Sequence, residues 1–138
     1  MLHSISQLKF SKNPNGKLFT DVWGDIRLAD YERYSAGSKL QVVVNKHEMG
    51  VVEVVGFKDF RLQKLTHCLS MFNCGQGVKH QKMLLHKYYD TREKEINDDT
   101  VFMFVTFKWV HRNMEEQEQL MEDWWADKKE QFPYISNH

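Results

Sequence analysis

The chain has little of several residues that mark special classes of protein. Its 138 residues include two cysteines, two prolines and seven glycines, which excludes a disulfide-rich scaffold and a low-complexity chain. No apolar run approaches the roughly 20 residues of a membrane span, and the first residues lack the basic flank and apolar block of a secretory signal. We therefore expect a cytoplasmic protein with no membrane partner, whose Cys68 and Cys74 are ordinary reduced thiols.

Neither sign of charge dominates, since 19 Lys and Arg balance 19 Asp and Glu. The two signs are nevertheless separated along the chain. Residues 1–113 hold 17 basic against 12 acidic side chains, and residues 114–138 hold two against seven. A basic body tolerates a polyanionic partner, although ordinary solvation of a surface explains the excess nearly as well.

Aromatic residues make up 13% of the chain, and its length fits one domain with a substantial core. β-Branched runs predict paired strands joined by a turn at 48–50, with Gly56 as a bulge. Apolar residues on both faces of 100–109 predict a central strand. In chain order, the predicted elements are an extended segment 17–27, strands 40–44 and 51–57, helices 65–72 and 78–89, the strand 100–109, and an acidic helix 114–132 stopped by Pro133.

Four segments of the chain carry a family resemblance. They are Gly16-Lys17-Leu18-Phe19-Thr20, the step from Tyr34 through Gly37 into a strand, Leu65-Thr66 leading to Tyr88, and Phe102 to Lys108. In this order they resemble the ASCH family of PUA-like proteins, over about residues 14–112. The resemblance implies an α+β fold, a small and mostly antiparallel PUA-like β-barrel with two inserted helices. We expect this domain at 1–113. The added C-terminal acidic amphipathic helix, 114–138, would pack on the domain or on a partner, for example in a homodimer.

The ASCH family is linked to RNA and modified nucleosides. Its small members include amidohydrolases that cleave N4-acylated cytidine, and others reported as ribonucleases. In the amidohydrolase pattern a Lys and a Thr three residues apart work with a Glu in the helical insert, without a metal or cofactor. Lys17 and Thr20 occupy the first two positions, but Asn73 stands near the third, and an amide cannot shuttle protons. Enzyme activity is therefore uncertain unless Asp21 or Glu53 substitutes.

Each candidate residue has a functional and a plain structural interpretation. A desolvated Lys17 could activate the Thr20 hydroxyl as a nucleophile, or it is an exposed lysine beside a strand threonine. Trp23 either stacks on a base or fills the barrel end, and the Tyr88-Tyr89 pair either lines a cleft or belongs to the core. His67, Cys68, Cys74 and His80 lack the tight spacing of zinc ligands, so we expect no metal site.

Binding of RNA or a modified nucleoside is the first functional prediction. Lys17 and Arg27 would neutralise phosphate, Trp23 would stack on a base, and Thr20 and Asn73 would hydrogen-bond a base edge. The alternative is a hydrolase acting on an acylated nucleobase, with Thr20 as nucleophile and Lys17 as base. A third interpretation is an interaction protein that works through the Trp124-Trp125 pair of its acidic helix.

Overall fold

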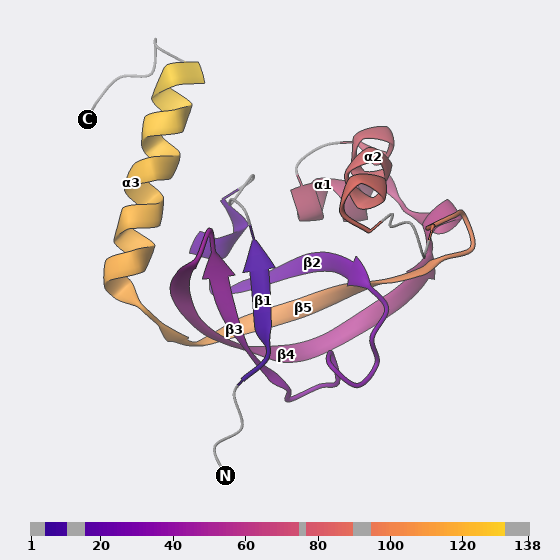
Figure 1. The fold of residues 1–138 in the computed structure, drawn as a ribbon, viewed down its shortest axis with the longest axis horizontal. Coiled ribbons are helices and arrows are strands. Elements are labelled where there is room, and N and C mark those ends of the chain that lie inside the picture. The colour runs from indigo at the N-terminus through magenta and orange to yellow at the C-terminus, as the bar shows by residue number, and fades with distance from the viewer. Residues whose placement is uncertain (1–4, 11–15, 75–76, 90–94, 132–138) are drawn as a thin grey trace.

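A five-stranded mixed sheet curls into a half-barrel in the computed structural model of the chain (Figure 1). The structure describes residues 5–10, 16–74, 77–89 and 95–131. The strands are β1 (Gln7–Phe10), β2 (Val22–Leu28), β3 (Lys39–Val44), β4 (His47–Arg61) and β5 (Val101–Arg112). The helices are α1 (His67–Cys74), α2 (Val78–Tyr89) and α3 (Met114–Gln131), with 3₁₀ turns η1 (Lys17–Phe19) and η2 (Leu62–Lys64). Within the described ranges, no helix is long and apolar enough to cross a membrane.

The strand order is β1-β3-β4-β5-β2, which places β1 and β2 at the two edges of the sheet. β1 pairs with β3 in parallel, and the other three pairs are antiparallel. The predicted α+β class, the barrel-like sheet and the two helices inserted between β4 and β5 are confirmed. The sheet is mixed, however, and it stays open between β1 and β2 as a half-barrel.

Local backbone irregularities bend the long strand β4. Its register against β5 shifts between Val54 and Gly56, which confirms the predicted bulge. The turn before β4 lies at Asn45 and Lys46, both with positive φ (47° and 72°), and the prediction of a turn at 48–50 is wrong. Two consecutive left-handed residues make a turn whose twist matches that of the flanking strands. Gly50 lies inside β4, where an added Cβ would come 2.1 Å from the His111 carbonyl oxygen.

The core lies on the concave side of the sheet and under the inserted helices. Alternate residues of β3 and β5 supply the larger cluster, and Trp23 and Tyr34 join it. A smaller cluster forms between α2 and the sheet, around Ile26, Leu85 and Phe102. Val105 and Phe107 are fully buried, and β5 pairs with β4 on one side and β2 on the other. The segment predicted as central is therefore an internal strand, although β4 is the middle strand of the sheet.

Helix α3 packs on the domain along one face. Gln117 is buried, and its Nε2 donates to the Met49 carbonyl oxygen at 3.1 Å. Trp124 meets the ring of Phe19 edge-on, with the ring centroids 5.8 Å apart. Met121 and Trp125 are 43% and 46% exposed, and their spacing of four places them on one stripe beside the packed face. The helix is thus anchored to β4 and η1, and it leaves a second apolar stripe uncovered.

Candidate functional site

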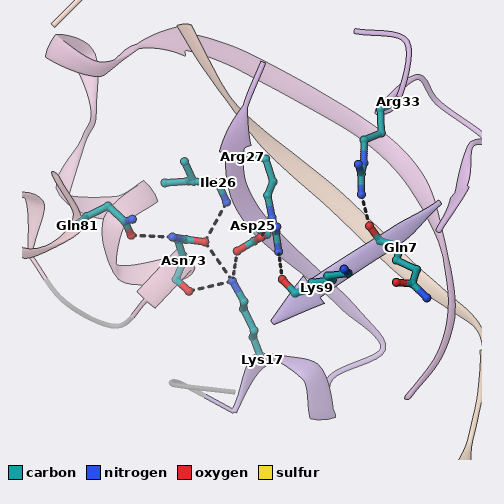
Figure 2. A network of polar contacts seen from close by, with 9 residues as sticks. All are labelled: Gln7, Lys9, Lys17, Asp25, Ile26, Arg27, Arg33, Asn73 and Gln81. Carbon is teal, nitrogen blue, oxygen red and sulfur yellow. Dashed lines mark hydrogen bonds and ion pairs between the residues drawn. The ribbon is translucent and has the colours of Figure 1, made fainter. Parts of the chain in front are cut away.

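A buried polar network joins four elements on the open side of the half-barrel (Figure 2). Lys17 comes from η1, and Asp25 and Arg27 come from the edge strand β2. Asn73 and Gln81 reach the same place from α1 and α2. Strand periodicity places Asp25 and Arg27 on one face of β2, so the strand presents a carboxylate and a guanidinium side by side.

The Lys17 ammonium is enclosed by oxygen acceptors. Its Nζ lies 2.6 Å from Asp25 Oδ1 and donates to the Asn73 carbonyl oxygen at 2.9 Å and to Asn73 Oδ1 at 3.1 Å. The Lys17 and Asp25 side chains are each only 8% exposed. A buried ammonium needs a counterion and hydrogen-bond acceptors, and here a carboxylate and two further oxygens supply them.

Asp25 is the carboxylate shared by the two cations of this network. Burial raises the pKa of its carboxyl, but the charges of Lys17 and Arg27 and their hydrogen bonds outweigh burial and hold the pKa below the ordinary value of 3.8. Its second oxygen accepts from Arg27 Nε. The carboxylates named as possible substitutes for the missing Glu lie elsewhere, since Asp21 pairs with Arg112 and Glu53 with Lys108.

Asn73 ties the inserted helices to the edge strand. Its Oδ1 accepts from the Ile26 N–H at 2.9 Å as well as from Lys17, and its Nδ2 donates to Gln81 Oε1 at 2.7 Å. The Asn73 side chain is therefore placed beside Lys17, as the family resemblance implied. Its amide acts on protein partners as both donor and acceptor, which a carboxylate could not do in the same position.

Thr20 and Trp23 lie close to the network, but each is engaged by the protein. Residues 17–19 form a 3₁₀ turn where an extended segment was expected, and Thr20 Oγ1 donates to the Lys17 carbonyl oxygen at 2.6 Å. Trp23 is 5% exposed and packs on Phe107, with centroids 4.9 Å apart. Its indole nitrogen is buried and has no hydrogen-bond partner among the described residues. Tyr88 belongs to α2, but its side chain lies outside the described part of the structure.

A pocket of about 250 Å³ adjoins the network through Arg27. Besides Arg27, its lining includes Arg33, Tyr34 and Tyr89. Arg33 donates to the Gln7 carbonyl oxygen of β1, and its Nε is buried without a partner in the described residues. Burial raises the pKa of Tyr34 and of Tyr89, more than the nearby Arg27 lowers them. Both phenols are therefore neutral hydrogen-bond donors at ordinary pH.

Two of the pocket residues, Arg33 and Tyr34, were missed from the sequence, and both precede the Gly37 turn. Of the Tyr88-Tyr89 pair, predicted to line a cleft or to belong to the core, Tyr89 lines the pocket. Asp25 was also missed, although its spacing of two from Trp23 and from Arg27 places the three on one side of a strand.

Comparison with known proteins supports the fold alone. No family model matches the chain, and a search of curated proteins finds no match. The structure resembles the crystal structure of EF3133 from Enterococcus faecalis V583, which is described by the family model DUF984. The TM-score is 0.57 at 10% sequence identity, and the match covers 86% of this chain and 83% of that one.

Proposed function

We propose that this chain is an ASCH/PUA-like module that binds RNA or a modified nucleoside in the pocket beside β2. The observation that carries the proposal is the convergence of Arg27 and Arg33 with Tyr34 and Tyr89 on one pocket. Guanidinium groups suit phosphate, because their fixed donors match its oxygens. Neutral phenols offer hydrogen bonds and ring faces to a base. The resemblance to the ASCH family supports the same class of ligand.

In this proposal the network residues position the pocket, and the residues that line it make the contacts. Asp25 neutralises Lys17 and holds Arg27, whose Nη2 donates to the Lys9 carbonyl oxygen at 3.1 Å. Arg27 thus keeps a defined orientation at the edge of the pocket. Asn73 fixes Lys17 and β2 from the helical side. Arg33, the second arginine of the pocket, donates to the Gln7 carbonyl oxygen of β1.

Binding is favoured over hydrolysis because Lys17 Nζ and the Thr20 hydroxyl each hydrogen-bond to other groups of the protein. Lys17 Nζ donates to Asp25 and to two oxygens of Asn73. Activation of Thr20 would need an amine directed at its hydroxyl, and that hydroxyl donates to a main-chain carbonyl. Cleavage of N4-acylated cytidine, or of RNA, therefore remains the alternative function.

The test is an equilibrium titration with cytidine 5′-monophosphate and with N4-acetylcytidine, followed by amide NMR. We expect shifts around β2, Tyr34 and Tyr89, and intact ligand at the end. Arg33→Ala should weaken binding of the monophosphate by about tenfold or more, as the loss of a charge-assisted contact predicts. Arg61→Ala is the matched control, since Arg61 is exposed and does not line the pocket, and it should bind normally. Equal binding by Arg33→Ala would contradict the proposal, and release of acetate would favour the hydrolase.

A further inference from the structure

The outer face of α2 carries a concentration of positive charge. Lys79, Lys82, Met83, His86 and Lys87 line a shallow, open hollow of about 590 Å³ on this helix. Val78–Tyr89 contains no Asp or Glu at all, so no acidic side chain of the helix offsets these groups. Met83 is 62% exposed in their midst. A single exposed apolar side chain is ordinary, so the feature that distinguishes this face is its one sign of charge.

The basic face and the pocket lie on the same short helix. The opposite side of α2 is inward, where Gln81 holds Asn73 and Leu85 enters the smaller core cluster. Tyr89, at the end of α2, lines the pocket. From Lys79 to Lys87 the helix rises about 12 Å. A ligand in the pocket that continued along α2 would therefore meet cations over that length.

We infer that this face binds the phosphate backbone of a single-stranded RNA whose terminal or flipped nucleotide occupies the pocket. The inference rests on the proposed function and deepens it, because it makes the ligand an oligonucleotide. Lys79, Lys82 and Lys87 neutralise successive phosphates, and the exposed Met83 supplies an apolar surface for a base. A strand of negative charge is the occupant that complements a helix face with no acid of its own.

The test compares the unmodified protein with the triple variant K79A/K82A/K87A. Alanine favours the helix and the lysines are at the surface, so α2 keeps its fold. Binding of a single-stranded RNA octamer is measured between about 0.05 and 0.3 M salt, with cytidine 5′-monophosphate as the short ligand. Three lost phosphate contacts at about 0.7 each should reduce the slope of log K against log salt by about 2. At about 0.1 M salt that corresponds to up to 100-fold weaker octamer binding.

The matched control is K39A/K58A/K129A, which removes three exposed lysines that line neither hollow. We expect the control to keep the octamer affinity, and both variants to bind the monophosphate as the unmodified protein does. Equal loss in the two triple variants would overturn the inference, as would an octamer that binds no more tightly than the monophosphate. In both cases monophosphate binding would leave the pocket proposal standing. If neither ligand binds the unmodified protein, the proposed function fails first, and this inference with it.

An acidic protein is the competing occupant of the face. Poly-glutamate of matched charge, added as a competitor, distinguishes an acidic protein from RNA as the occupant. We expect it to displace the octamer only at much higher concentration, because it offers no base for Met83 or the pocket. Displacement at equal charge concentration would overturn the RNA assignment.

Discussion

Arg27 on β2 donates from Nη2 to the carbonyl oxygen of Lys9 on β1 at 3.1 Å. These strands are the two edges of the sheet, so one side chain bridges the open side of the half-barrel (Figure 2). Main-chain pairing would have closed the barrel and filled this space. A guanidinium bridge joins the edges while leaving room for the adjoining pocket. The integrity of the site therefore depends on what holds Arg27 in place.

Replacing Asp25 by Asn should destabilise the fold by about 3 kcal/mol or more, because it leaves two largely buried cations without their counterion. Urea denaturation gives the free energy of unfolding. Asp21→Asn is the matched control on the same segment. Asp21 is 95% exposed in its pair with Arg112, and exposed pairs contribute less than about 1 kcal/mol. Similar losses in the two variants would show that the buried network contributes little.

Stability should also depend on Asp25 as the pH falls. The folded pKa of Asp25 lies below its ordinary value of 3.8, so its carboxylate contributes stability above that value. The contribution is lost as the pH falls through the folded pKa. The difference in unfolding free energy between the unmodified protein and Asp25→Asn should thus be constant from about pH 5 to 7 and shrink below about pH 4. A difference that persists unchanged at low pH would rule out this origin.

Asn73 and Gln81 should be energetically coupled, since the amide of one donates to the other at 2.7 Å. Asn73→Ala also leaves the Ile26 N–H and Lys17 short of an acceptor, so we expect it to cost about 2 kcal/mol or more. In a double-mutant cycle, Gln81→Ala should cost less when Asn73 is already alanine, by about 1 kcal/mol. Strictly additive losses would mean that the two side chains act independently.

Gly24 and Gly56 allow a comparison between a crowded and an open glycine of the sheet. A Cβ on Gly24 would lie 2.2 Å from the Phe104 ring, whereas one on Gly56 meets nothing within 4 Å. Gly24→Ala should therefore destabilise the protein by about 1 kcal/mol or more, because the ring must move off the strand. Gly56→Ala should be neutral or slightly stabilising. Thermal denaturation distinguishes them, and a tolerant Gly24→Ala would show that the Phe104 ring swings away freely.

Trp124 should anchor α3, and its neighbour should not. Trp124→Ala removes the contact with Phe19, so amide exchange in the second half of α3 should accelerate. Trp125→Ala removes an exposed ring and should leave the exchange pattern as it was. If Trp125→Ala had the larger effect, and only at high protein concentration, α3 would be held by a second copy of the chain.

The sequence predicted those elements whose periodicity is strong. The helix expected over 78–89 coincides with α2, and the apolar 100–109 segment corresponds to the internal strand β5. The turn at Asn45-Lys46 was missed because neither residue is glycine, and the left-handed conformation they adopt is unusual for lysine. β1 has four residues, too few to show a period, and its parallel pairing involves distant partners.

Only part of the site could be predicted from the sequence. Lys17 and Asn73 lie far apart in the chain, and the family resemblance alone suggested that they meet. Asp25, which pairs with Lys17, lies within a strand. A charged residue in a strand is normally expected to face solvent. The burial of Asp25 depends on two cations from η1 and β2. No local sequence pattern indicates that these cations will neutralise the buried carboxylate, because they meet it only when the elements pack.

The pairing of β2 with β5 has a consequence for how the chain is made. Val22 pairs with Lys108 and Leu28 with Phe102, so the partner of β2 follows β3, β4 and both inserted helices in the chain. Until Val101–Arg112 has left the ribosome, β2 has no ladder to join, and Asp25 and Trp23 of β2 cannot take up their buried positions. Such distant pairing slows folding. Emergence of β5 from the ribosome is therefore the event that commits the nascent domain to its structure.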